Sequence, residues 1–323
     1  MSFNPIVIVG GEPQSIFLEL ILKTFNSKSN NFKKPIILIS SKNVFDENIK
    51  KFKKNFRYNL LNTNLANIKK NQINLFNIEY TKFSFYKKKI STDSNLFITK
   101  SFDKAIEIMK KKNISGIING PISKQTFLRG TFNGITEYLA KKTKSKNPVM
   151  LIFNNKLSVS PLTTHIPLSQ VSKEIKKKKI IMNVIKINEF YKKFIKRKPK
   201  IAITGLNPHC ESFDKENKEK NEIIPAIKYL KKKKYSIQGP FASDTIFLRQ
   251  NIKKFDVILG MYHDQVLTPF KTIFKFDAIN VTLGLKYLRV SPDHGTAINL
   301  IGKNKANPIS LLKCINFINK FGK

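Results

Sequence analysis

The chain has 323 residues, enough for two domains or one large one, and carries a formal net charge of +39. Its two cysteines, Cys210 and Cys314, are too few for a disulfide framework, and no apolar run is long enough to span a bilayer. The first residues also lack the basic start and cleavage site of a secretory signal, so we expect a cytoplasmic protein without a membrane partner.

The net charge invites a role in binding nucleic acid, because it comes from 60 Lys and Arg against 21 Asp and Glu. The lysines are spread along the whole chain, however, and runs such as 176–179 and 231–234 fall in or beside helical patterns, as solvated faces do. No helix-turn-helix, zinc-finger or ribonucleoprotein motif is present. We therefore expect no nucleic-acid partner, and only a general attraction of anionic substrates.

In the first half of the chain, short apolar strands alternate with amphipathic helices, which is typical of an α/β fold. Strands are predicted at 5–9, 35–40 and 116–120. Ser15 is the predicted N-cap of a helix after the sequence GGEP, and Ser101 that of a helix over 102–112. The polar stretch 41–99 is poorly periodic, and we predict no elements there.

The second half continues the alternation. Residues 149–153 and 157–165 predict a hairpin, 169–196 a long helix, 200–209 a strand, 223–234 a helix, and 256–264 a strand. Three of these strands end in a histidine: His165, His209 and His263. Because ligands of α/β sheets bind beyond the carboxyl ends of strands, we expect a site at this edge.

Three neutral imidazoles would bind a divalent metal and leave positions open for substrate oxygens. Hydrogen-bonded core histidines are the alternative, but three of the four histidines at strand ends favour a site. Lys271 and Arg289 could clamp a phosphate or carboxylate, although in a chain with 60 basic residues surface charge is the stronger reading for either residue alone. Rossmann, P-loop, HEXXH and nucleophile-elbow signatures are absent from the sequence.

Six motifs carry a resemblance to a known family. They are TTHIPL (163–168), GLNPH (205–209), GPFASDTIF (239–247), YHDQ (262–265), NVTLGL (280–285) and DHGTA (293–297). In order and spacing they resemble the 4-hydroxythreonine-4-phosphate dehydrogenase family of vitamin B6 synthesis, over roughly residues 116–306. The GGEP sequence near the N-terminus is a weaker match.

The resemblance implies an isocitrate/isopropylmalate-dehydrogenase-like α/β fold of two domains with the active site in the cleft between them, in a homodimer. The expected cofactor-side domain is 1–125 with 260–323, and the expected dimer-side domain is 126–259. The resemblance also implies NAD, with NADP left open, and one divalent metal, which could be zinc, magnesium or cobalt. By family pattern the metal ligands are His165, His209 and His263, with His165 reaching across from the partner subunit.

The remaining roles also follow from the family pattern. Asp244, Asp264 and Lys271 are the expected catalytic residues. The expected substrate-binding positions are Ile135, Thr136, Lys271, Asn280 and Arg289. The expected cofactor-binding residues are His294, Gly295, Thr296, Ala297 and Asn307.

The implied reaction is the oxidation and decarboxylation of 4-phosphooxy-L-threonine to 3-amino-2-oxopropyl phosphate. Three departures bear on it: Ile135 stands where the family has a histidine, the loop after GLNPH is charged instead of glycine-rich, and QSIF follows GEP. Losing a polar substrate contact costs about 1–3 kcal/mol. The alternatives are therefore a dehydrogenase of another phosphorylated hydroxy acid, such as a threonate or erythronate phosphate, and a non-catalytic relative that only binds a metabolite.

Overall fold

The computed structural model describes residues 4–26, 32–62, 65–87, 89–111, 113–128, 131–132, 134–211, 217–275 and 277–322. The chain divides into two compact units. Unit 1 is Met1–Lys144 with Leu285–Lys323, and unit 2 is Ser145–Gly284. The divisions thus fall after Lys144 and Gly284, whereas the sequence led us to expect them after residues 125 and 259.

Unit 1 is built on a parallel sheet in the order β3-β4-β2-β1-β5-β12. Its strands are short, and the central ones are almost entirely apolar because helices cover both faces of the sheet. The strands are β1 (Ile6–Val9), β2 (Ile36–Ser40), β3 (Tyr58–Leu60), β4 (Ile73–Asn77), β5 (Gly116–Asn119) and β12 (Arg289–Pro292).

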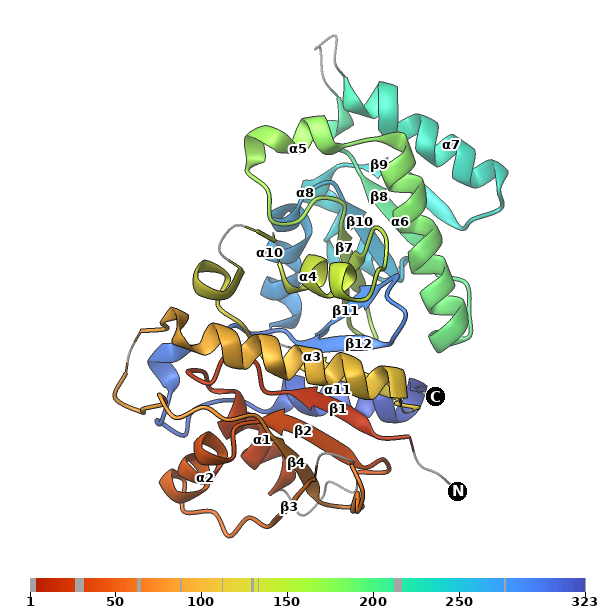
Figure 1. The fold of residues 1–323 in the computed structure, drawn as a ribbon. Coiled ribbons are helices and arrows are strands. Elements are labelled where there is room, and N and C mark those ends of the chain that lie inside the picture. Colours follow the sequence, from red (N-terminus) through yellow and green to blue (C-terminus); the bar gives the residue numbers. More distant parts are fainter. Residues whose placement is uncertain are drawn as a thin grey trace. The chain divides into compact units, whose positions relative to one another are not determined.

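The helices of unit 1 lie on the two faces of this sheet (Figure 1). Side chains of β1 alternate between the two faces: Val7 and Val9 share a buried cluster with residues of α3, and Ile6 and Ile8 are buried on the opposite face. There α11 packs on β5 and β12 and contacts α1. The helical segments are α1 (Phe17–Phe25), α2 (Lys42–Lys51), η1 (Thr92–Ser94), α3 (Asn95–Lys111), η2 (Lys124–Leu128), α4 (Ile135–Lys142), η6 (Ile298–Leu300) and α11 (Ile309–Phe321).

Unit 2 holds a mixed sheet in the order β11-β6-β7-β10-β8-β9. The pairs β11–β6 and β6–β7 are antiparallel, and β7, β10, β8 and β9 run parallel to one another. The antiparallel β6–β7 pair confirms the predicted hairpin. The strands are β6 (Val149–Phe153), β7 (Ser158–Pro161), β8 (Ile201–Thr204), β9 (Ile237–Phe241), β10 (Val257–Gly260) and β11 (Ile279–Leu283).

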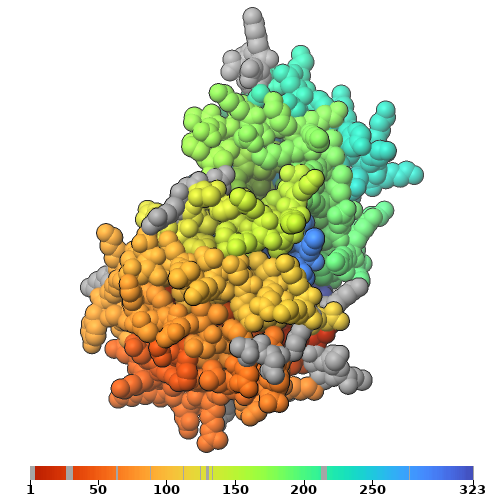
Figure 2. Space-filling model, viewed as in Figure 1, coloured from red at the N-terminus to blue at the C-terminus, as the bar shows by residue number. Residues whose placement is uncertain are grey.

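Helix α10 packs on β7 and β10, where Val266, Leu267 and Phe270 enter a buried cluster. On another part of unit 2, α6 contacts α7, β6 and β11. In the space-filling view, green and cyan residues, the part of the chain that includes α6 and α7, form much of the visible surface of unit 2 (Figure 2). The helical segments are α5 (Leu168–Glu174), α6 (Lys177–Phe190), η3 (Tyr191–Ile195), η4 (Pro208–Cys210), η5 (Glu219–Ile223), α7 (Ile224–Lys232), α8 (Ser243–Ile246), α9 (Arg249–Ile252) and α10 (His263–Phe274).

The α/β prediction is confirmed, but several boundaries were wrong. Ser101 is no N-cap: it lies inside α3, where its hydroxyl donates to the Phe97 carbonyl oxygen at 2.8 Å. The predicted helix over 169–196 is broken at Ile175, which is extended and fully buried. The stretch 41–99, left unassigned from sequence, contains α2, β3, β4 and the start of α3. No helix in the described residues is long and apolar enough to cross a membrane.

Candidate active site

The three histidines that follow predicted strands lie at one edge of the sheet of unit 2. β7, β10 and β8 are neighbours and run parallel, so their carboxyl ends meet at the same edge. His165 follows β7, His263 follows β10, and His209 follows β8. The expectation that three strands deliver histidines to one edge is therefore met by the topology of unit 2.

Two of these histidines are close together. The ring centroids of His165 and His263 are 5.8 Å apart. His263 begins α10, and its Nδ1–H donates to the Asp264 carboxylate at 2.6 Å. Because this bond occupies Nδ1, the other ring nitrogen, Nε2, is the one left to bind a metal or substrate.

His209 sits on a tight turn after β8. Its φ is 56° and that of Cys210 is 62°, both in the left-handed region. The turn folds back on Gly205, where a Cβ would lie 2.8 Å from the Cys210 sulfur and 3.1 Å from its Cα. A side chain at Gly205 would therefore push on the backbone that carries His209.

The same turn is held by the buried carboxylate of Glu219. It accepts hydrogen bonds from the Leu206 and Asn207 backbone amides at 2.7 and 2.8 Å, and from the Asn207 side-chain amide at 2.9 Å. Burial alone would raise the pKa of Glu219, but these donors outweigh it and leave the pKa below its usual value. Glu219 is thus an ionised anchor for the His209 turn.

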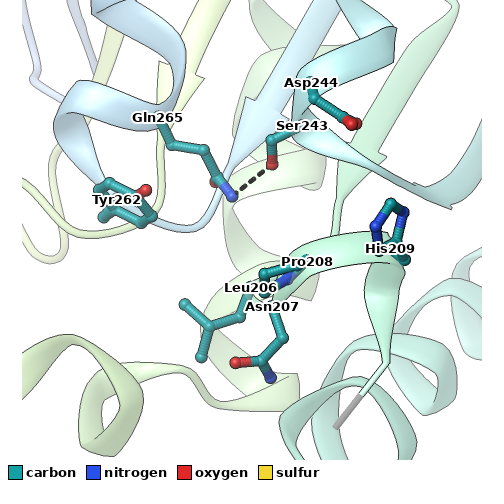
Figure 3. Close-up of a pocket in the computed structure, with 8 residues that line it drawn as sticks. All are labelled: Leu206, Asn207, Pro208, His209, Ser243, Asp244, Tyr262 and Gln265. Atoms are coloured by element: carbon teal, nitrogen blue, oxygen red, sulfur yellow. Dashed lines mark hydrogen bonds between the residues drawn. The ribbon is translucent and has the colours of Figure 1, made fainter.

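A pocket of about 270 Å³ opens beside this turn. It is lined by Leu206, Asn207, Pro208, His209, Ser243, Asp244, Tyr262 and Gln265. Figure 3 shows the Asp244 carboxylate and the His209 imidazole on the same side of the pocket, with Tyr262 across from them. Asp244 is exposed, so its carboxylate can reach a ligand in the pocket.

The chemistry of these donors suits a divalent metal. Imidazoles oriented by a carboxylate, with a further carboxylate nearby, are common ligands of zinc and similar ions. Among the described residues of one chain, however, no three His, Cys, Asp or Glu side chains lie close enough to hold a metal. A complete ligand set would need a further donor or a small rearrangement of these loops.

Two expected substrate contacts also lie in unit 2. Lys271 is on α10, about two turns beyond His263, and is partly buried. Asn280 is on β11, and its buried Oδ1 accepts no hydrogen bond from any residue that the structure describes. A buried acceptor without a donor costs about 1–3 kcal/mol, which a ligand or a water could relieve.

The other expected substrate contacts lie in unit 1. Arg289, on β12, is 1% exposed, and its Nε donates to the Asn119 side-chain oxygen at 2.7 Å. Burial lowers the pKa of Arg289 to about 10, so its charge persists at neutral pH but is poorly solvated. Ile135 and Thr136 begin α4, and Ile135 packs against the large hydrophobic cluster of unit 1.

The expected cofactor residues form one loop of unit 1 that docks on α1. The Ile16 amide donates to the Thr296 carbonyl at 3.2 Å, and the Phe17 and His294 rings are 6.4 Å apart. Further along, Glu19 accepts from the Ala306 amide at 2.9 Å. The loop runs from His294, Gly295, Thr296 and Ala297, which has φ 46°, to Asn307, whose Oδ1 accepts from the Ile309 amide at 3.0 Å.

The sequence analysis missed three buried polar residues that contact the candidate site residues or the segments that carry them. They are Asn119 beside Arg289, Glu219 under the His209 turn, and Gln265 next to the pocket. For Gln265 a signal was available, because a buried glutamine two residues after a candidate ligand needs partners for its amide. Asn119 and Glu219 carried no such signal, since their partners are distant in sequence.

Comparisons with known proteins identify the family of this chain. The family model for pyridoxal phosphate biosynthetic protein PdxA matches residues 31–318. A 4-hydroxythreonine-4-phosphate dehydrogenase of Sulfurihydrogenibium sp. (strain YO3AOP1) is 36% identical over 325 residues, covering 96% of each chain. One from Aquifex aeolicus (strain VF5) is 42% identical over 210 residues, 64% of this chain and 65% of that protein.

The fold is matched as well. The solved structure of a 4-hydroxythreonine-4-phosphate dehydrogenase from Klebsiella pneumoniae has a TM-score of 0.79 to this chain at 24% identity, covering 98% of both. The family model spans most of the sequence, and the first of the relatives aligns over nearly all of it. This chain belongs to the PdxA family of pyridoxal phosphate biosynthesis.

Proposed function

We propose that the protein is a 4-hydroxythreonine-4-phosphate dehydrogenase that oxidises and decarboxylates 4-phosphooxy-L-threonine to 3-amino-2-oxopropyl phosphate, using NAD and a divalent metal. Besides the family, one observation supports this proposal most directly. The carboxyl ends of three neighbouring parallel strands are each followed by a histidine, beside a pocket that contains an aspartate. Such an edge suits the binding of a hydroxy acid to a metal.

When bound, the metal would acidify the substrate hydroxyl and stabilise the charge left by loss of carbon dioxide, and NAD would accept the hydride. His209 and His263 would hold the metal, and Asp264 fixes the ring of His263 by its 2.6 Å bond to Nδ1. Asp244 is available in the pocket to take the hydroxyl proton. Lys271 is assigned to the same catalytic step.

The phosphate and carboxylate of the substrate are anionic and would bind cationic and hydrogen-bonding side chains. We assign them to Lys271, Asn280 and Arg289, with Thr136 as a further hydrogen-bonding group. The buried Asn280 Oδ1 without a donor and the buried guanidinium of Arg289 are groups whose burial an anionic, hydrogen-bonding ligand would compensate. The loop His294–Asn307 is assigned to the cofactor.

The test is NADH formation, followed by absorbance, with 4-phosphooxy-threonine before and after chelation and re-addition of metal. Turnover that disappears on chelation and returns with metal is expected. His209→Ala should abolish turnover and weaken metal binding, whereas the control His294→Ala should raise the KM for NAD and leave metal binding intact. Full activity of His209→Ala would refute the metal assignment.

The subunit that supplies His165 can be tested by mixing two inactive variants, His165→Ala and His209→Ala. If His165 acts across subunits of a dimer, random exchange makes mixed dimers with one intact site, and about a quarter of the sites recover. If His165 acts within its own chain, where its ring is 5.8 Å from that of His263, mixing recovers nothing.

A second candidate is a dehydrogenase of another phosphorylated hydroxy acid, such as a threonate or erythronate phosphate. It is favoured by Ile135, which cannot make the polar contact expected of a histidine at this position. Metal-dependent NADH formation with those compounds, and none with 4-phosphooxy-threonine, would select it. Metal binding without turnover of any of them would leave a metabolite-binding relative.

A further inference from the structure

We propose that Gln265 is the positioning residue of the metal site, because its single amide group ties together the three loops that carry His209, Asp244 and His263. The inference rests on the proposed function, since it takes His209 and His263 as metal ligands. It adds a residue that is no metal ligand in that assignment and acts through the loops that carry the ligands.

Gln265 lies in the first turn of α10 and is 7% exposed. Its Oε1 accepts from the Met261 amide at 2.6 Å and from the Thr204 hydroxyl at 2.9 Å. Its Nε2 donates to the Gly205 carbonyl at 2.8 Å and to the Ser243 hydroxyl at 2.7 Å. Both lone pairs of the oxygen and both hydrogens of the nitrogen are therefore in use.

These four bonds end on three different segments. Thr204 ends β8, and Gly205 follows it at the start of the His209 turn. Ser243 starts α8 and is followed directly by Asp244. Met261 follows β10, two residues before His263.

The start of α10 packs closely against the end of β10. A Cβ on Gly260 would lie 2.3 Å from Val266 Cγ1 and 3.1 Å from Gln265 Oε1, so the helix approaches the strand end as closely as a glycine permits. Figure 3 shows the Gln265 amide reaching Ser243 beside the pocket that His209 and Asp244 line. A fully bonded amide in such a place fixes the spacing of the ligands before any metal arrives.

Cobalt binding measures this role without requiring turnover. The full-length apoprotein is titrated with Co²⁺, followed by its visible absorption, in the wild type, Gln265→Met and Gln265→Glu. Met keeps the volume and removes all four bonds. Glu keeps acceptors for Met261 and Thr204 but places an oxygen against the Gly205 carbonyl, so it disturbs chiefly the start of the His209 turn.

The expected result is that both variants bind Co²⁺ about tenfold to a hundredfold more weakly, with a changed absorption band. The matched control is Asn74→Leu in unit 1. Asn74 is 0% exposed and also fully bonded, donating to the Ile36 and Lys69 carbonyls and accepting from the Lys69 amide and Asn59. This control should lose stability yet bind Co²⁺ as the wild type does.

Folded Gln265→Met or Gln265→Glu protein with wild-type cobalt affinity and spectrum would overturn the inference. Should the Met variant fail to fold, the Glu variant decides. Equal weakening in Asn74→Leu would also overturn it, because the effect would then be one of general stability. A wild-type protein that shows no cobalt band would instead overturn the metal assignment of the proposed function, and the inference with it.

Discussion

The buried carboxyl group of Glu12 makes the stability of unit 1 depend on pH. Glu12 is 2% exposed and follows β1, where it accepts from the Ser94 hydroxyl at 3.0 Å and from the Gln14 amide at 3.4 Å. Burial raises its pKa from 4.5 to about 7, although these bonds and the charge of Lys87 oppose the rise. Tyr80 also faces it, with a pKa raised to about 12 by burial and by the charge of Glu12.

The sign follows from the order of the two pKa values. Below pH 4.5 the carboxyl is protonated in the folded and the unfolded chain, and it costs nothing. As the pH rises toward 7, the unfolded chain loses its proton first, so the folded state becomes relatively less stable. Above pH 7 the full penalty applies, about 3 kcal/mol for a pKa raised from 4.5 to about 7. That is a large part of the free energy of unfolding of a typical protein, which is roughly 5–15 kcal/mol.

The perturbation is Glu12→Gln, which keeps an acceptor oxygen and removes the charge. Its free energy of unfolding, from urea denaturation followed by circular dichroism, should match the wild type near pH 4.5 and exceed it by about 3 kcal/mol at pH 8. The control is Glu107→Gln on α3, an exposed carboxylate whose pKa is lowered by Lys111 and Lys104. Its difference from the wild type should stay constant from pH 5 to 8. A constant difference for Glu12→Gln as well would refute the reasoning.

Two further predictions concern the other buried anchors. Asn119→Asp places a carboxylate against the Arg289 guanidinium and neutralises the charge that the substrate would bind. In steady-state kinetics it should raise the KM for the phosphorylated substrate about tenfold and change the KM for NAD by less than about twofold. Equal rises in both KM values would contradict the role of Arg289. Glu219→Gln should cost stability at neutral pH, where the carboxylate accepts three hydrogen bonds. The cost should shrink as the pH falls through the lowered pKa of Glu219, and a cost in denaturation experiments that is equal at pH 7 and pH 3 would count against it.

Much of unit 2 could be predicted because its signals are local. β8 and β10 are short, mostly apolar runs, and β7 alternates serine with Val159 and Pro161; both patterns identify strands without knowledge of their neighbours. Because parallel strands share a carboxyl edge, His165, His209 and His263 could be placed at the same edge of the sheet of unit 2. The hairpin of β6 and β7 followed from the apolar run 149–153 and the alternating stretch 157–161, which a short polar turn separates.

The failures have a common cause, which is that a partner distant in sequence decided the outcome. Ser101 has the residue type of an N-cap, but Phe97 and Ile98 bury against the sheet and extend α3 over it. Ile175 interrupts a helical pattern because its side chain is fully buried with an extended backbone. Likewise, Gln265 bonds to Thr204 and Ser243, and the residues next to Gln265 in the sequence do not indicate these partners.

At position 135 the family pattern favours a histidine, whereas the packing of this chain favours the isoleucine that it has, Ile135. It begins α4 and packs against the hydrophobic cluster of unit 1, so an imidazole there would lose apolar contacts worth about 1–2 kcal/mol. If the substrate is 4-phosphooxy-threonine, the same imidazole would gain a polar contact worth about 1–3 kcal/mol.

We therefore expect Ile135→His to lower the unfolding free energy and also the KM for 4-phosphooxy-threonine, the latter about tenfold. Ile135→Val, which trims the packing and adds no polar group, should lower only the stability. An unchanged or raised KM in the His variant would mean that the isoleucine suits the natural substrate of this chain. The reacting molecule would then present an apolar or absent group at this position, which is the difference that would separate another phosphorylated hydroxy acid from 4-phosphooxy-threonine.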